Sequence, residues 1–172
     1  MCDDPVNSLF RLDPDRSIHR MESGICISNG LGWSPDLSTF YYTDSLTRMI
    51  YAYDYEAQTG AIRNRRVFDH VPQDGGLPDG LAVDTQGYIW SARWGGWKVV
   101  RYAPDGRVDR EVAIPVEFPT SCAFGGENLN ELYITSAWIE VLPTARSAQP
   151  LAGDLFRLKV DVPGLPEPFF AG

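Results

Sequence analysis

The chain has 172 residues and a formal net charge of −8, with 44 % apolar and 22 % charged residues. This acidic balance argues against a nucleic-acid partner, because phosphate recognition needs a basic stripe and the sequence has none. No apolar run approaches the ~18 residues of a membrane span. The first residues also lack the basic-then-apolar pattern of a secretory signal. We therefore expect a cytoplasmic protein with no membrane partner.

The sequence predicts many short strands joined by tight turns, because it combines 16 glycines and 13 prolines with 12 % aromatic residues. In chain order, four segments share a short apolar strand that runs into a turn. They occupy residues 8–15, 49–55, 99–106 and 154–159. Aligned on Arg11, Ala52, Arg101 and Arg157, they lie 41, 49 and 56 residues apart. Such spacing indicates an internal repeat.

A second segment alternates with the first, and it begins each repeat with small residues. It covers residues 29–33, 79–83 and 120–124, and an aromatic or β-branched strand follows each time, at 39–43, 88–91 and 131–135. Weaker outer strands are expected at 65–68 and 109–114. Four strands in about 40–50 residues are typical of one β-propeller blade. The sequence therefore predicts an all-β propeller built from four-stranded blades.

The length of the chain limits how many blades it can hold. At about 45 residues per blade, 172 residues form about three to four blades. The first apolar strand is already running at Leu9, so the repeat begins in the middle of a unit. We therefore expect residues 1–172 to form a partial propeller domain whose N-terminal blades are absent or supplied by a partner.

The repeat places three polar residues in equivalent positions, namely Asn29, Asp79 and Thr120. The first strand of each propeller blade lines the central axis, so these side chains are expected to converge there. A ring of oxygen donors suits a hard divalent cation. The alternative is purely structural, because Asn29-Gly30 is also a type I′ turn signal and Pro78-Asp79-Gly80 a type I turn signal.

Three further features have weaker functional interpretations. Asp44 follows a strand and either faces the axis or is an exposed loop carboxylate, and we favour the loop. Residues 93–97 (RWGGW) form either a substrate wall or a turn at a blade edge with packed tryptophans. Cys122 lies near the expected axis without a histidine in register, so we expect a core thiol and not a nucleophile.

Several of these motifs together resemble one family. Residues 27–36 (ISNGLGWSPD), 54–66, 77–84 (LPDGLAVD) and 119–126 (PTSCAFGG) are similar, in order and spacing, to the SMP-30/gluconolactonase/regucalcin family. The resemblance covers nearly the whole chain and corresponds to roughly the second half of a family member. It implies that the chain is part of a six-bladed propeller.

The resemblance also implies a function, which is metal-dependent hydrolysis of sugar lactones. Asn29 matches a metal ligand of the family, and Asp79 matches a residue that is both metal ligand and proposed general acid/base. The implied cofactor is one divalent ion, which could be calcium, zinc, manganese or magnesium. The family's third protein ligand, a glutamate in the first blade, has no counterpart here. Thr120 matches a family segment to which no ligand role is attached.

Two other functions remain open from the sequence. One is a divalent-cation (calcium) binding protein, similar to regucalcin, without turnover. The other is an inert propeller fragment in which Asn29 and Asp79 only form turns. An open half-ring would expose the edges of its end blades, which favours pairing with a second copy. We therefore expect a homodimer or a complex that completes the propeller, acting on a small-molecule lactone.

Overall fold

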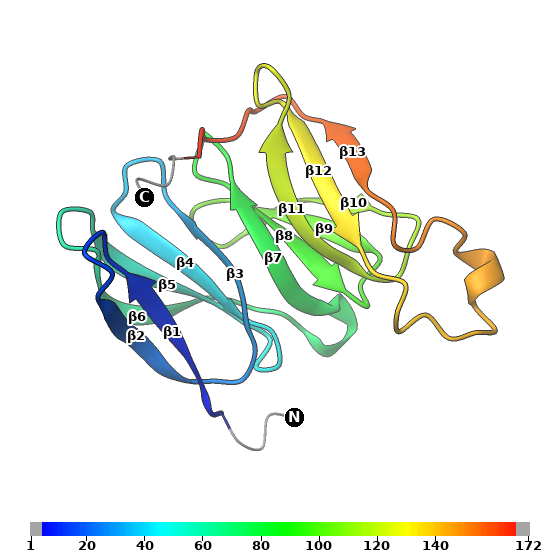
Figure 1. The fold of residues 1–172 in the computed structure, drawn as a ribbon. Helices are drawn as coiled ribbons and strands as arrows, with labels where there is room; N and C mark the ends of the chain where they lie inside the picture. Colours follow the sequence, from blue (N-terminus) through cyan, green and yellow to red (C-terminus); the bar gives the residue numbers. More distant parts are fainter. Residues whose placement is uncertain (1–4, 168–172) are drawn as a thin grey trace.

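The computed structural model describes residues 5–167, which form four antiparallel sheets arranged side by side (Figure 1). Two short 3-10 helices, η1 (Gln73–Gly75) and η2 (Arg146–Ala148), lie in connections between strands. Within this range no helix has the length and apolar character needed to cross a membrane. The predicted all-β class is therefore confirmed.

The four sheets follow one another along the chain. The first contains β1 (Asn7–Leu12) and β2 (Ile18–Ile25). The second contains β3 (Ser28–Trp33), β4 (Thr39–Asp44), β5 (Met49–Glu56) and β6 (Ala61–His70). The third contains β7 (Leu77–Val83), β8 (Ile89–Trp94), β9 (Lys98–Tyr102) and β10 (Val108–Ala113). The fourth contains β11 (Pro119–Gly125), β12 (Glu131–Ser136) and β13 (Phe156–Lys159).

The core lies between successive sheets, because the central strands are buried on both faces. In β8, Ile89 packs towards the β3–β6 sheet, whereas its neighbour Trp90 packs towards the β11–β13 sheet. A third cluster fills the space between the β1–β2 sheet and the β3–β6 sheet, and includes Ile25, Phe40 and Tyr42. This alternation explains why β4 and β8 are buried at nearly every position.

The order of strands within each sheet confirms the repeat. Small-residue, aromatic, apolar and outer strands occupy successive places in the second and third sheets, and the first three of them recur in the fourth. The long final spacing of 56 residues arises because the connection between β12 and β13 contains η2. The strand β2 was not predicted, since most of its side chains are exposed and its sequence does not alternate.

Candidate functional site

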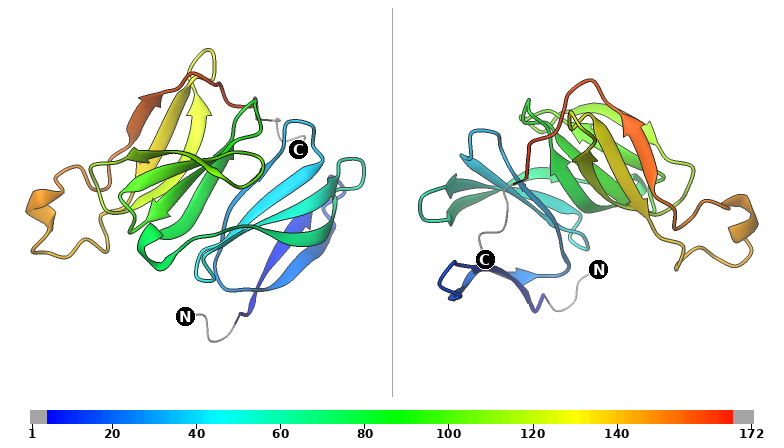
Figure 2. Two further views of the ribbon diagram at one scale, coloured as in Figure 1. Left: turned by 180° about the vertical axis from the view of Figure 1, so that it is seen from behind. Right: turned by 45° about the horizontal axis from the view of Figure 1, so that its top comes forward.

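The first strands of three sheets, β3, β7 and β11, lie next to one another in the middle of the molecule (Figure 1, Figure 2). They approach so closely that glycine is required between them. A Cβ atom on Gly30 would lie 2.5 Å from the backbone nitrogen of Leu81, and one on Gly80 would overlap the side chain of Ser121. Asn29 and Asp79 each precede one of these glycines. The close approach of β3 and β7 therefore places the two residues near each other on adjacent strands.

The turn alternative for these residues is wrong. Asn29 lies within β3 and Asp79 within β7, and neither following glycine has the positive φ that a type I′ turn needs. Both dipeptides instead sit at a register irregularity, between residues 28 and 31 and between residues 78 and 81. The three other Pro-Asp pairs, at 14–15, 35–36 and 104–105, do form turns. The repeat therefore distinguishes Asp79 from ordinary turn aspartates.

The environment of Asp79 is half-buried and lacks a cationic partner. Burial raises the pKa of the Asp79 carboxyl to about 6, against the lowering effects of hydrogen bonding from the Asn29 side chain and the Gly80 backbone. No lysine or arginine among residues 5–167 forms an ion pair with Asp79. A cation placed at this carboxylate would offset the cost of burying its charge.

Asn29 is held in place by Ser45, which lies in the turn between β4 and β5. Its amide nitrogen donates a hydrogen bond to Ser45 Oγ over 3.2 Å, and Ser45 is itself buried. The same amide group also donates towards the Asp79 carboxylate, so the carbonyl oxygen would become a cation ligand only after the amide turns. Sequence reasoning missed Ser45, because the equivalent position of the next sheet is Trp94, so the repeat carries no signal for it.

These two residues fit a hard divalent cation but do not complete its coordination. A carboxylate and an amide oxygen are suitable ligands, yet calcium takes about 6–8 oxygens. Within residues 5–167 no group of three His, Cys, Asp or Glu side chains is placed to hold a metal. The remaining ligands would have to be water molecules, substrate oxygens or groups from another chain.

Thr120 does not join this pair. Its hydroxyl lies 2.6 Å from the hydroxyl of Thr135 in the neighbouring strand β12, so the two side chains satisfy each other across the sheet. The predicted ring of three oxygen donors therefore reduces to Asn29 and Asp79.

Asp44 is not an exposed loop carboxylate, and that expectation is wrong. The residue ends β4 with 1 % of its surface exposed. Its two oxygens accept hydrogen bonds from the backbone nitrogens of Cys26 at 3.1 Å and Ile27 at 2.9 Å. Asp44 thus fixes the chain immediately before β3, the strand that carries Asn29.

Arg93 is a buried residue between sheets and not part of a substrate wall. Its guanidinium donates to the hydroxyl of Tyr102 and lies 3.7 Å from Asp69 Oδ2 of the β3–β6 sheet. Trp94 packs on Phe118 with ring centroids 4.6 Å apart. Cys122 is a buried core thiol as predicted, and burial raises its pKa to about 12.

Comparison with known proteins shows to which family the chain belongs. Residues 2–138 match the family model described as SMP-30/Gluconolactonase/LRE-like region. The chain belongs to this family. The predicted SMP-30/gluconolactonase family is thus confirmed, and the relatives described below carry related names.

Two curated relatives of this SMP-30/gluconolactonase chain illustrate the range of names. A regucalcin of Danio rerio is 42 % identical over 167 residues, which are 96 % of this chain and 57 % of the relative. A pentonolactonase, XacC, of Haloferax volcanii is 44 % identical over 163 residues, covering 92 % of this chain and 56 % of the relative. The chain therefore spans about half the length of the curated relatives that it matches.

Two solved structures of the SMP-30/gluconolactonase group share the fold. A calcium-binding protein, regucalcin, from Agrobacterium tumefaciens has a TM-score of 0.91 and 30 % identity, over 97 % of this chain and 57 % of its own. A gluconolactonase from Xanthomonas campestris has a TM-score of 0.69 and 31 % identity, over 91 % of this chain and 44 % of its own. The family includes both lactonases and a calcium-binding protein.

We expect Gly30→Ala to disturb the pairing of Asn29 with Asp79. The added methyl would lie 2.6 Å from the backbone oxygen of Asp79, so β3 and β7 must separate at a cost of about 1–3 kcal/mol. Chemical denaturation and cation titration measure the two effects. Gly24→Ala is the control for cation affinity: its methyl meets nothing within 4 Å, but the φ of 71° makes the substitution cost stability through backbone strain, so it should destabilise the chain and leave cation affinity unchanged. Unchanged cation affinity in Gly30→Ala would contradict the close-approach argument.

Asp79 should also make stability depend on pH when no metal is bound. The folded-state pKa of about 6 lies above the ordinary value of 3.8, so the folded chain holds the proton more tightly than the unfolded chain. The contribution of the Asp79 carboxyl to the free energy of unfolding is therefore fully present below about pH 4 and is lost as the pH rises through 6. With EDTA present, Asp79→Asn should therefore be more stable than wild type at pH 7.5 by about 1 kcal/mol after solvent screening. Urea denaturation at pH 4 should show no such difference.

Proposed function

We propose that this chain contributes the Asn29–Asp79 part of the site of a metal-dependent hydrolase of sugar lactones. The observation that carries the proposal is the pairing of Asn29 and a half-buried, pKa-raised Asp79 on adjacent inner strands. The pentonolactonase and gluconolactonase names of relatives support the substrate class. The whole activity is expected to need groups that residues 5–167 do not provide.

Three residues of this chain would each have a role in the reaction, namely Asn29, Asp79 and Ser45. Asn29 Oδ1 and an Asp79 oxygen would hold the divalent cation, which supplies Lewis-acid polarisation of the lactone carbonyl when bound. Asp79 would also accept a proton from the attacking water, a role that suits a carboxylate whose pKa is raised towards neutrality. Ser45 Oγ would stay in contact with the Asn29 amide in either orientation, because a hydroxyl can accept from the amide nitrogen or donate to Oδ1.

A second candidate is a calcium-binding protein without turnover. The Agrobacterium tumefaciens structure described as a calcium-binding regucalcin favours it, since that protein has the higher TM-score of the two solved structures compared above. The third candidate is an inert propeller fragment. In that case Asn29 and Asp79 have no ligand, and their pairing serves only the packing of β3 against β7.

One experiment separates these candidates. Hydrolysis of glucono-δ-lactone is followed at neutral pH with calcium, zinc, manganese or magnesium, for wild type and Asp79→Ala, while bound metal is measured on the same samples. Metal-dependent hydrolysis that Asp79→Ala removes would support the lactonase. Metal binding without hydrolysis favours the calcium-binding candidate. Neither binding nor hydrolysis leaves the inert fragment.

A further inference from the structure

One buried arginine links the two sheets that carry Asn29 and Asp79. Arg93, in β8, donates a hydrogen bond from Nη2 to the hydroxyl of Tyr102, and that hydroxyl donates to Asp69 Oδ2 at 2.6 Å. The same nitrogen of Arg93 lies 3.7 Å from Asp69 Oδ2. Asp69 belongs to β6, so a guanidinium and a phenol of the β7–β10 sheet converge on a carboxylate of the β3–β6 sheet.

This link lies at the same level of the two sheets as the candidate site. In the β3–β6 sheet, the row of paired residues next to Asp69 runs across β5 and β4 to the residue before Asn29. In the β7–β10 sheet, Arg93 pairs directly with the residue before Asp79. Each member of the ion pair is therefore connected through its own sheet to one residue of the site.

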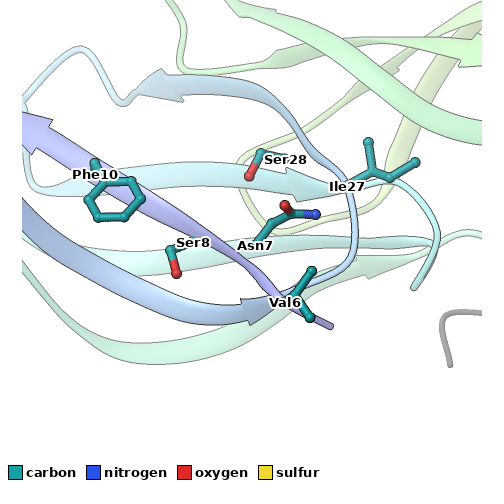
Figure 3. Close-up of a pocket in the computed structure, with 6 residues that line it drawn as sticks. All are labelled: Val6, Asn7, Ser8, Phe10, Ile27 and Ser28. Carbon is teal, nitrogen blue, oxygen red and sulfur yellow. The ribbon is translucent and has the colours of Figure 1, made fainter. Parts of the chain in front are cut away.

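On the side away from β7, the start of β3 borders an open cavity. Figure 3 shows this cavity of about 500 Å³, with Asn7 on one wall and Ser28 on the other. Asn7 Nδ2 reaches across it with a hydrogen bond to the carbonyl oxygen of Cys26 at 2.7 Å. Within residues 5–167, the position of Asn29 relative to Asp79 therefore depends mainly on contacts between the β3–β6 and β7–β10 sheets.

The apolar packing between these two sheets does not by itself fix their relative position. It includes Tyr41 and Ile50 from one sheet and Leu81 and Ile89 from the other. Hydrophobic contact is non-directional, so it tolerates small shifts of one sheet against the other. A hydrogen-bonded network in a low-dielectric interior is directional and specifies one arrangement. Arg93 supplies the charge of such a network at the level of the site.

The free energy of unfolding alone gives no reason for a buried guanidinium here. Nε and Nη1 of Arg93 have no hydrogen-bond acceptor among the described residues, and burial lowers the pKa of Arg93. Without Arg93, Asp69 would keep its hydrogen bond from Tyr102, and its side chain is 22 % exposed to water. An apolar side chain can often replace a buried ion pair without loss of stability. The contribution of Arg93 is therefore to arrangement.

We propose that Arg93 is a positioning residue of the cation site. Through Asp69 it fixes the β7–β10 sheet against the β3–β6 sheet, so that Asn29 and Asp79 lie within reach of one ion. The inference rests on the proposed function, because it concerns the same site. It adds a residue that touches neither the cation nor the substrate.

The test compares Arg93→Met with Arg101→Met in the full chain, with Mn²⁺ alone as the probe. Arg101 is the matched control, because it is a buried arginine of the same sheet whose ion pair with Asp84 lies at the opposite end of β7. Arg93→Met should raise the Kd for Mn²⁺ about tenfold and leave the urea midpoint close to that of wild type. Arg101→Met should lower the urea midpoint and keep the Kd within about twofold. Isothermal titration calorimetry measures the Kd at a temperature where both variants are folded.

Asp69→Asn tests the other side of the link, and it keeps the inference testable if Arg93→Met does not fold. The amide oxygen can still accept from Tyr102, but the charge that faces Arg93 is gone, so Mn²⁺ binding should weaken.

A second measurement needs no metal. A Cβ atom on Gly30 would lie 2.5 Å from the Leu81 nitrogen, so the α-protons of Gly30 should give a nuclear Overhauser effect to the Leu81 amide. With EDTA present, this effect should weaken in Arg93→Met and Asp69→Asn and persist in Arg101→Met.

Four results would overturn the inference. They are an Mn²⁺ Kd that Arg93→Met leaves within about twofold of wild type, equal weakening by Arg93→Met and Arg101→Met, weakening by Arg93→Met without weakening by Asp69→Asn, and an unchanged Gly30–Leu81 effect in Arg93→Met. Absence of Mn²⁺ binding by the wild type would reject the proposed cation site instead. The metal-free measurement would then decide whether Arg93 holds the two sheets in place.

Discussion

Replacing Asp79 with asparagine is expected to lower the metal-dependent rate of lactone hydrolysis by about 10²–10⁴-fold, the usual contribution of a general base. The substitution keeps the shape of the side chain but removes the negative charge and the ability to accept a proton. Both proposed roles of Asp79 are therefore lost, while the contact with Asn29 can persist. The measurement is kcat/KM for glucono-δ-lactone at saturating metal.

Asp36→Asn is the control for this prediction, because Asp36 also follows a proline. Its carboxylate lies in an exposed turn, where it accepts hydrogen bonds from Ser34 Oγ at 2.6 Å and Ser38 N at 3.0 Å, and these bonds lower its pKa to about 2. Hydrolysis should stay within about twofold of wild type, since the carboxylate only stabilises a turn. Equal losses in both variants would mean that Asp79 acts through folding and not through chemistry.

Replacing Arg101 with methionine is expected to destabilise the chain by about 3–5 kcal/mol, because it leaves the buried carboxylate of Asp84 without its charge partner. Asp84 is 0 % exposed. One of its oxygens, Oδ2, accepts hydrogen bonds from Arg101 Nη2 at 2.6 Å, Arg101 Nε at 3.0 Å and Trp90 Nε1 at 3.1 Å. Methionine keeps the apolar stem of arginine, so lost charge dominates the effect. Urea denaturation measures it.

Arg107→Met is the matched control, at an arginine that also forms an ion pair. Its Nε lies 2.8 Å from Asp105 Oδ2, but the two side chains are 80 % and 57 % exposed. Water screens this pair, so its removal should leave the urea midpoint essentially unchanged. If the two variants lost similar stability, burial of the Asp84–Arg101 pair would not be what holds β7, β8 and β9 together.

Much of the fold is predictable because each sheet repeats the same burial pattern. The small-residue strands β3, β7 and β11, and the aromatic strands β4 and β8, are recognisable from composition alone. The strand β2 is not, since its stability comes from pairing with β1 and not from its own pattern. The total number of blades in a complete propeller stays a prediction.

The sequence predicts a residue of the candidate site only where the position of that residue in the repeat determines its neighbours. Asn29 and Asp79 share a place before a glycine that packs against the next strand, so aligning the repeats finds them. The same alignment is misleading at Thr120, because Thr135 on the paired strand satisfies its hydroxyl. The alignment gives no information about Asp44, because the buried carboxylate of that residue is satisfied by the backbone nitrogens of residues 26 and 27.

The most direct test of the central claim is a titration of the chain with calcium, zinc and manganese, followed by melting temperature. A cation that binds only the folded state stabilises it in proportion to its affinity. We predict that at least one cation raises the melting temperature of wild type, and that Asp79→Ala and Asn29→Ala each abolish the rise. A wild-type melting temperature that no cation changes would contradict a metal site at Asn29 and Asp79.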